Sequence, residues 1–145
     1  ATALAVPAEG LRQFAYYDPP GILTACYGHT GPDVFKNVKY SLDQCKRWLS
    51  ADMLNAIAIV ERCVPGLPAA ILAAFADAVF NMGPTIACNR KASTAARYLY
   101  AGNLIAACNQ LPRWDKARVL GVMVALPGLT TRRAAEQQLC LTGTL

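Results

Sequence analysis

The chain has 145 residues, of which 54% are apolar, and carries a net charge of +5 at pH 7, so it fits one domain or two small lobes that share a cleft. The positive charge favours an anionic partner such as bacterial cell wall, anionic lipid or nucleic acid. Nucleic acid ranks last because the sequence lacks a Lys/Arg-rich run and any nucleic-acid module signature, and no apolar stretch approaches the roughly 20 residues that span a bilayer.

The first elements are predicted from a change in residue pattern along the N-terminal part of the chain. Residues 3–13 fit a short helix. Beyond them, strand formers surround Pro19-Pro20-Gly21, which is a turn signal. A small antiparallel sheet is therefore expected to end near Gly28 or Thr30, and the residues that follow, up to Tyr40, are predicted to form a loop.

A long helix is predicted to begin after Ser41, because Ser41 and Gln44 have the spacing of a capping box. Apolar residues then recur at helical spacing as far as Val60. The stretch 68–82 is apolar nearly all round, which is typical of a central, buried helix. Three further helices are expected over 92–101, 103–110 and 130–141.

This order of elements favours an α+β fold that is mostly helical. A small sheet lobe of about residues 10–45 would be linked by the long helix to a larger helical lobe, made of about residues 60–145 and the N-terminal helix. Both lobes would belong to a single domain, 1–145. The cleft between two lobes is a natural place for a substrate.

Two carboxylates and a hydroxyl are the chemically informative groups near the N-terminus. Glu9, Asp18 and Thr24 follow the spacing Glu-x8-Asp-x5-Thr, across a predicted helix end and a hairpin. One carboxyl can act as a general acid while the other, helped by the hydroxyl, holds a water molecule. This equipment suits cleavage of a glycosidic bond with inversion, which requires carboxyls roughly 6.5–9.5 Å apart. The triplet alone is not specific, because short patterns often match by chance.

The six cysteines indicate whether the protein works in an oxidising or a reducing compartment. No two form a CxxC pair and the chain has one His, which argues against a zinc site. Their even number and wide spacing favour three disulfides in an oxidising compartment over six buried free thiols. Residues 1–8, small and apolar, fit either the end of an export segment or the first helix.

Six cysteines permit 15 pairings, and their pattern alone does not choose among these. Cys26 and Cys45 are expected to pair within the small lobe, because Cys45 lies in the first turn of the long helix that should pack beside the sheet. Two further bonds would then join residues of the helical lobe: Cys63, Cys88, Cys108 and Cys140.

Several motifs together resemble phage-type lysozymes, the endolysins of glycoside hydrolase family 24. The run Glu9-Gly10-x-Arg12-x-x-Ala15-Tyr16-x-Asp18, with Gly21-x-x-Thr24 and Tyr27-Gly28-His29-Thr30, is similar to the active-site segment of that family. Phe80-Asn81-Met82-Gly83 resembles a cleft-lining motif. Arg113-Trp114 and Gly128-Leu129-x-x-Arg132-Arg133-x-Ala135-Glu136 resemble the C-terminal signature. Cys26 and Pro19-Pro20 depart from the family pattern but remove no group that the chemistry needs.

The resemblance implies a lysozyme-like fold and a muramidase that hydrolyses the β-1,4 bond between N-acetylmuramic acid and N-acetylglucosamine in peptidoglycan. By resemblance, Glu9 is the general acid, and Asp18 with Thr24 positions the attacking water. No cofactor or metal is implied. Two rivals stay open: a lytic transglycosylase acting on the same bond, and a catalytically inactive, cationic cell-wall-binding domain.

The resemblance also implies supporting roles for other residues. Phe80 and Asn81 would bind substrate, with Asn81 donating hydrogen bonds to the N-acetyl groups. His29 and Asp52 would tie the sheet to the long helix. One of two arginines near the C-terminus would lie beside Glu9, and Arg133 is favoured over Arg132.

The expected partner of the chain is bacterial peptidoglycan, and the expected state is a monomer. The protein is expected to be exported from the host cytoplasm and to act in the periplasm or cell wall. A membrane tether would require a segment upstream of Ala1.

Overall fold

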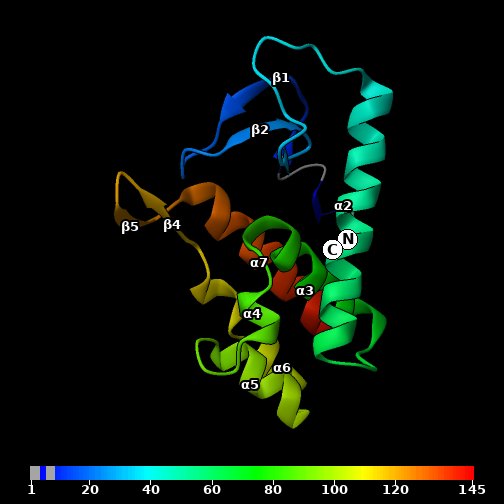
Figure 1. The fold of residues 1–145 in the computed structure, drawn as a ribbon. Helices are drawn as coiled ribbons and strands as arrows, with labels where there is room; N and C mark the ends of the chain where they lie inside the picture. Colours follow the sequence, from blue (N-terminus) through cyan, green and yellow to red (C-terminus); the bar gives the residue numbers. More distant parts are fainter. Residues whose placement is uncertain (1–3, 6–8) are drawn as a thin grey trace.

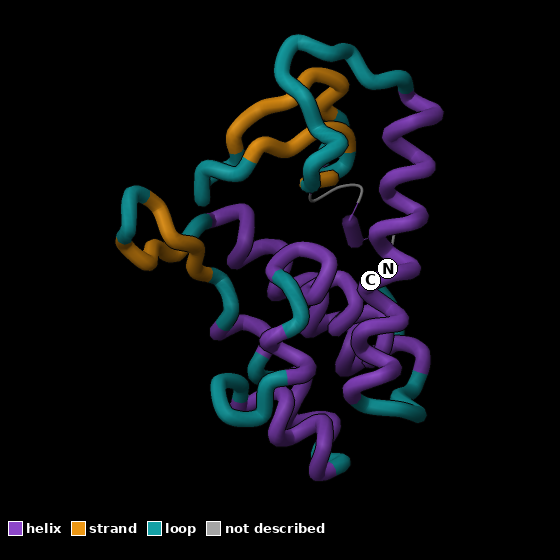
Figure 2. Tube along the Cα trace, viewed as in Figure 1, coloured by secondary structure: helices purple, strands orange, loops and turns teal. Residues whose placement is uncertain are grey.

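The structure, a computed structural model, describes residues 4, 5 and 9–145. It is an α+β fold in which a small sheet lies at one end of a group of helices, and one long helix runs along both (Figures 1 and 2). Leu4, Ala5 and Glu9 are helical, but β1 begins at Arg12, so the prediction of a helix as far as residue 13 was wrong. Gly10 has a φ of +67°, a left-handed conformation that ends the helix before the strand formers begin.

Three antiparallel strands form the sheet in the order β1-β2-β3. They are β1 (Arg12–Tyr17), β2 (Leu23–Cys26) and β3 (His29–Thr30), and the end of the sheet at Thr30 is as predicted. The loop that follows returns to the sheet, where the Tyr40 backbone N–H donates to the Gln13 carbonyl at 2.8 Å. The loop thus leads from the sheet to the start of the long helix.

The long helix is α2 (Leu42–Cys63), and the Ser41 hydroxyl caps it by accepting from the Gln44 backbone N–H at 3.1 Å. The Gln44 side chain instead accepts from Arg47, so only the Ser41 half of the predicted capping box is recorded. The buried side of α2 follows the predicted helical spacing, at Cys45, Leu49, Met53, Ala56 and Val60.

The predicted central helix is α3 (Ala69–Met82), and its residues 74–79 are all buried. It packs between α2 and α7 (Pro127–Thr142), around the main apolar core. The shorter helices α5 (Thr94–Ala101) and α6 (Leu104–Cys108) also agree with prediction. The helix α4 (Thr85–Cys88) and the 3-10 turn η1 (Leu111–Arg113) were not predicted.

The last helix begins three residues earlier than predicted. Pro127 lies in the first turn of α7, where its missing N–H is not needed. The Thr130 hydroxyl, inside this helix, donates to the Asp115 carboxylate at 3.0 Å. The Pro127-Gly128 pair therefore opens the helix.

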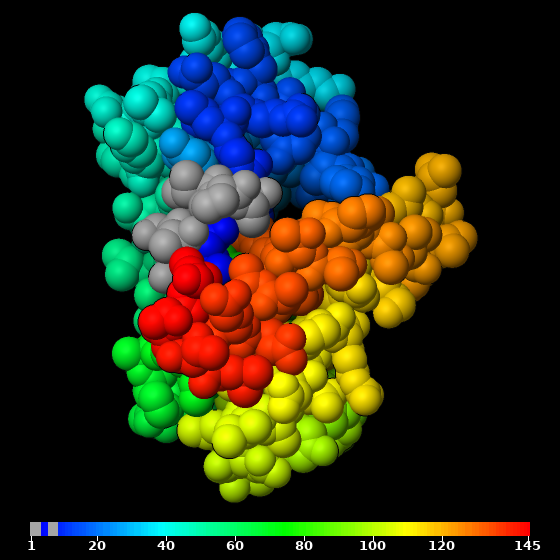
Figure 3. All heavy atoms as spheres, turned by 180° about the vertical axis from the view of Figure 1, so that it is seen from behind, coloured from blue at the N-terminus to red at the C-terminus, as the bar shows by residue number. Residues whose placement is uncertain are grey.

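A second hairpin, β4 (Lys116–Val119) and β5 (Val122–Ala125), was missed by the sequence analysis. Leu120 and Gly121 form its turn with φ values of +49° and +82°. Leucine rarely adopts a positive φ, so this turn carries no strong sequence signal. The hairpin projects from the body beside the start of α7 (Figures 1 and 3).

Three disulfides join the six cysteines, which confirms the sequence expectation. Cys26–Cys45 ties the sheet to α2, as predicted. Two further bonds, Cys63–Cys88 and Cys108–Cys140, lie in the helical part. Among the helices of the described residues, none is both long and apolar enough to cross a membrane.

Candidate active site

Glu9 is helical and lies three residues before the sheet begins at Arg12, and its side chain is 16% exposed. Arg132, from the distant helix α7, donates a hydrogen bond through Nη1 to Glu9 Oε1. The other side of the carboxyl faces Gly28, in the turn between β2 and β3. A Cβ atom at Gly28 would lie 2.7 Å from both Cδ and Oε2 of Glu9. Glu9 is thus enclosed by a guanidinium and a bare backbone.

Arg132 links Glu9 to a fully buried carboxylate. Its Nε and Nη2 atoms each donate at 2.8 Å to the two carboxylate oxygens of Asp77, on α3. Burial of Arg132 disfavours its charge, but the hydrogen bonds and charge of Asp77, and then Glu9, outweigh burial and raise the pKa of Arg132. The prediction that Arg133 lies beside Glu9 was therefore wrong, because Arg132 is the residue on that face of α7.

Arg133 points instead into the helical core. Its Nε and Nη2 lie 2.6 and 2.8 Å from the two carboxyl oxygens of Glu136. Nη2 also donates to Asn81 Oδ1 at 2.9 Å, and Nη1 to the Trp114 carbonyl at 3.4 Å. Burial lowers the pKa of Arg133, against the opposing effect of Glu136. Asn81 is thus held by Arg133, and its oxygen is occupied.

Glu136 and Asp77 have opposite pKa shifts. Burial, and then a hydrogen bond with Asp77, raise the pKa of Glu136 to about 10, while the charge of Arg133 opposes this rise. Burial alone would raise the pKa of Asp77 too, but hydrogen bonds from Arg132 and Glu136 lower it. Glu136 was singled out only as part of the C-terminal motif, and Asp77 was not singled out. A carboxylate within the apolar α3 was a usable signal, because buried charges require partners.

Asp18 and Thr24 are both anchored on the backbone of Ile22. Asp18 Oδ1 accepts from the Ile22 N–H at 2.7 Å, and the Thr24 hydroxyl donates to the Ile22 carbonyl at 2.9 Å. Thr24 is buried in β2, paired with Tyr16 of β1 and Thr30 of β3. The β1–β2 turn therefore brings the two predicted water-positioning groups to one place.

Tyr16 is a neighbour of both predicted catalytic carboxyls, and no role was predicted for it. Burial raises the pKa of its phenol, and the charges of Glu9 and then Asp18 raise it further. The Arg12 guanidinium, 4.5 Å above the Tyr16 ring, acts in the opposite direction. A raised pKa keeps the Tyr16 phenol neutral at ordinary pH.

His29 forms the predicted contact between sheet and helix. Its Nδ1 lies 2.6 Å from Asp52 Oδ2 on α2. Its Nε2 lies 2.9 Å from Asp33 Oδ1, and its ring stacks on Trp48 with 4.1 Å between centroids. Asp33 and Trp48 were not predicted, since neither has a distinctive sequence position. With both ring nitrogens bound to carboxylates, His29 fits a structural role.

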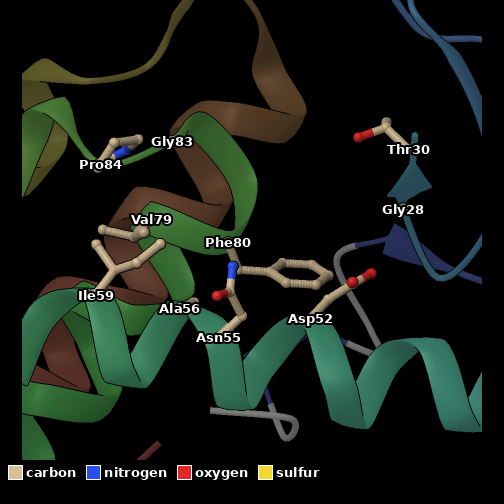
Figure 4. A pocket seen from close by; sticks show the side chains of 10 residues that line it. All are labelled: Gly28, Thr30, Asp52, Asn55, Ala56, Ile59, Val79, Phe80, Gly83 and Pro84. Carbon is tan, nitrogen blue, oxygen red and sulfur yellow. The ribbon is translucent and has the colours of Figure 1, made fainter. Parts of the chain in front are cut away.

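A cleft of about 340 Å³ adjoins this site. Gly28 and Thr30 of the sheet line one side, facing α2 residues and the end of α3, including Asp52, Asn55 and Phe80 (Figure 4). Phe80 thus lies where the cleft-lining resemblance placed it, whereas Asn81 is not among the lining residues. Gly28 both lines this cleft and lies against the Glu9 carboxyl, so Glu9 is a close neighbour of the cleft.

Among the residues that the structure describes, no group of three or more His, Cys, Asp or Glu side chains is arranged to hold a metal ion. The chemistry that the site can perform with its own residues is proton transfer by a carboxyl and orientation of a water molecule by a carboxylate and a hydroxyl.

Comparison with known proteins places the chain among phage lytic enzymes. The model of the family described as phage lysozyme matches residues 7–136. The chain is 35% identical over 136 residues to the SAR-endolysin of Bacteriophage PS119, covering 93% of this chain and 77% of that protein.

The fold of the chain is similar to two solved structures. For the endolysin from Escherichia coli O157:H7 phage FAHEc1 the TM-score is 0.83, at 28% identity, over 99% of this chain and 90% of that one. For the active form of P1 phage endolysin Lyz the TM-score is 0.81, at 29% identity, over 97% of this chain and 82% of that one.

Proposed function

Because the chain belongs to the phage lysozyme family and is therefore a lysozyme-type glycoside hydrolase, we propose that it hydrolyses the β-1,4 bond between N-acetylmuramic acid and N-acetylglucosamine in peptidoglycan. The observation that carries this proposal is the enclosure of Glu9 between Arg132 and Gly28, a residue that also lines a cleft. Peptidoglycan is an extended polymer, and an open cleft between a sheet and helices is a suitable site for such a substrate.

Glu9 protonates the leaving glycosidic oxygen. Arg132 occupies one oxygen of the Glu9 carboxyl, which fixes its orientation and leaves Oε2 for the proton. After proton transfer the same guanidinium stabilises the carboxylate that remains. The Gly28 backbone lets the carboxyl approach the turn closely, next to a residue that lines the cleft.

Asp18 and Thr24 hold the attacking water. Their shared anchor at Ile22 orients the second oxygen of Asp18 and a lone pair of the Thr24 hydroxyl, both of which can accept hydrogen bonds from water. The water attacks the anomeric carbon from the face opposite the leaving group, so the product has inverted stereochemistry. Phe80 lines the cleft and contacts the sugar.

The enzyme acts as an endolysin on the cell wall after export from the host cytoplasm, to lyse the host cell. The names of its relatives and its three disulfides support this location, because disulfides persist in oxidising compartments. Its partner is peptidoglycan, which suits the net charge of +5 because an anionic polymer attracts a basic protein.

The substitution Glu9→Gln tests the general acid. The amide keeps the size of the side chain but has no acidic proton, so hydrolysis of purified peptidoglycan should fall by roughly 10²–10⁴-fold. The matched control is Glu61→Gln, on an exposed position of α2, and both variants should keep the wild-type melting temperature. Near-normal turnover by Glu9→Gln would remove Glu9 from the mechanism.

Mass spectrometry of the released muropeptides separates the alternatives. Hydrolysis adds one water molecule to each product, whereas a lytic transglycosylase leaves an anhydro sugar. Recovery of anhydro products would favour the transglycosylase, and absence of any product would favour a non-catalytic wall-binding domain.

A further inference from the structure

Asp77 is a fully buried carboxylate to which the mechanism proposed above gives no role. It is the only charged residue of α3, and its neighbours Ala76 and Ala78 are also buried. Replacing a buried ion pair by apolar residues of similar volume is often neutral or stabilising. Stability alone therefore gives little reason for a carboxylate at this position.

The geometry of the bond between Asp77 and Arg132 fixes the guanidinium in place. Arg132 donates from Nε to Oδ2 and from Nη2 to Oδ1, both at 2.8 Å. Because a guanidinium is planar and rigid, two such bonds set both its position and its plane. The one nitrogen that remains is Nη1, and it donates to Glu9 Oε1. Asp77 thus determines where the donor that reaches Glu9 lies.

The helix α3 holds the same guanidinium at a second place. Phe80 follows Asp77 by three residues, so the two side chains lie on one face of the helix. The Arg132 Cζ atom lies over the Phe80 ring, 5.7 Å from its centroid, and Phe80 also lines the cleft. The guanidinium is therefore held between a carboxylate and an aromatic ring that both belong to α3.

We propose that Asp77 is a positioning residue for the general acid: it fixes Arg132 so that Nη1 holds the Glu9 carboxyl, and it cancels the charge of Arg132 so that Glu9 keeps its proton until the leaving oxygen takes it. As far as it concerns turnover, this inference rests on the proposed role of Glu9 as general acid. The bond between Asp77 and Arg132 does not depend on that role.

The charge of Asp77 matters because few other groups face Glu9. These are Arg132 from α7, the Tyr16 phenol from β1 and the backbone of Gly28. Without Asp77, a buried guanidinium would act on Glu9 alone and would favour its ionised form. An acid that is already ionised cannot protonate the leaving group, so the enzyme needs a neutral pair behind Glu9.

Asp77→Asn tests this role. The amide is close to the carboxylate in size, but it has no charge and its NH₂ cannot accept from Arg132. We expect kcat to fall by about tenfold or more, and the alkaline limb of the pH–kcat profile to move to lower pH by about 1 unit. KM should change little, because Asp77 is fully buried. A folded variant with wild-type kcat and an unmoved limb would overturn the proposal.

Glu136→Gln is the matched control, since it also changes a fully buried carboxyl into its amide. Glu136 pairs with Arg133, which points into the helical core and not toward Glu9. The control should therefore leave the alkaline limb of the pH–kcat profile near its wild-type position. An equal shift in both variants would show that the limb responds to any buried charge, and would contradict a specific role for Asp77.

A double-mutant cycle tests whether Asp77 acts through Arg132. Arg132→Lys keeps the positive charge but lacks the planar fork, so it cannot hold Asp77 by two bonds and Glu9 by a third. It should lower kcat by about tenfold or more. Adding Asp77→Asn to Arg132→Lys should lower kcat no further, because the two residues act as a unit. Losses that add would contradict the proposal.

The Nε–H group of Arg132 gives a readout that does not depend on activity or on the folding of Asp77→Asn. Because it donates to buried Asp77, its isotope-labelled NMR signal should exchange with solvent much more slowly than that of the exposed Arg62. Loss of the signal in Arg132→Lys assigns it. Fast exchange in the wild type would overturn the proposal.

The failure of this inference can be told from the failure of the proposed function. If Glu9→Gln is fully active, the proposed function fails, while slow exchange of the Arg132 signal still supports the bond to Asp77. If Glu9→Gln is inactive but Asp77→Asn keeps its kcat and its alkaline limb, the positioning role of Asp77 alone is wrong.

Discussion

The carboxyl of Glu9 occupies the space in which Gly28 would carry a side chain: a Cβ atom there would lie 2.7 Å from Glu9 Cδ. An added side chain at Gly28 would therefore push against the Glu9 carboxyl, which must keep a fixed position to act as the general acid. Gly28 also has a φ of +75°, so the turn between β2 and β3 requires glycine for two independent reasons.

Gly28→Ala should therefore displace Glu9 and lower turnover by roughly tenfold or more, because small misplacements of catalytic groups are costly. Gly66→Ala is the matched control, since Gly66 has a φ of +81° but no atom within 4 Å of an added Cβ. Both variants bear a similar backbone strain and should lose similar stability. Equal activity of the two variants would show that the contact with Glu9 does not matter.

Asp18 and Thr24 share an anchor at Ile22, and their variants should be ranked by what each leaves of the water site. Thr24→Ser keeps the hydroxyl and should retain substantial turnover. Thr24→Ala should be slower, and Asp18→Asn slowest, because the carboxylate is the stronger acceptor. Steady-state hydrolysis of peptidoglycan measures this order, and an unimpaired Thr24→Ala would remove the hydroxyl from the mechanism.

The contact between His29 and Asp52 should contribute to the stability of the protein and not to its turnover. His29 lies 2.6 Å from Asp52 and joins β3 to α2. His29→Ala should lower the free energy of unfolding by about 1.5–3 kcal/mol, the range for hydrogen bonds to charged groups. A double-mutant cycle with Asp52→Asn, followed by denaturant unfolding, measures the coupling. A large loss of kcat at unchanged stability would instead assign His29 a catalytic role.

Local signals in the sequence predicted much of this fold. The cap at Ser41 and the apolar α3 each depend on a single element, so they could be seen without coordinates. The pairing of Cys26 with Cys45 could be predicted because it needs only that the long helix packs beside the sheet that precedes it. The hairpin at Leu120 was missed because its turn places a leucine in a left-handed conformation.

The candidate site was predictable only in part, for a physical reason. Glu9, Asp18 and Thr24 lie close together in the chain, so their spacing is informative. Arg132 reaches Glu9 across 123 positions, and adjacent helix residues point about 100° apart. Whether Arg132 or Arg133 faces Glu9 depends on how α7 packs on α3, which no local pattern records.

The Cys26–Cys45 bond should affect both stability and turnover. It joins β2, two residues beyond Thr24, to the first turn of α2. The double variant Cys26→Ser/Cys45→Ser should lose about 3 kcal/mol of stability and also turnover below its melting temperature. Cys63→Ser/Cys88→Ser should lose a similar stability while keeping more turnover, because that bond lies within the helical part. Thiol titration of the unfolded, unreduced wild type should find no free thiol.

The pH dependence of stability should reveal Glu136. Burial raises its pKa to about 10 in the folded protein, whereas an unfolded Glu titrates near 4.3. Above that lower value the unfolded chain releases this proton and the folded protein keeps it. The stability that the protonated carboxyl contributes is therefore complete below about pH 4 and is lost as pH rises toward 10, by at most about 1.4 kcal/mol per pH unit.

Glu136→Gln cannot titrate, so its stability should not show this loss. Asp77 has a lowered pKa and produces the opposite trend, but it is present in both proteins and cancels in their difference. Thermal unfolding of wild type and variant between pH 5 and pH 9, at constant ionic strength, should give melting temperatures that diverge in favour of Glu136→Gln as pH rises. Parallel curves would show that Glu136 binds no more protons in the folded protein than in the unfolded chain.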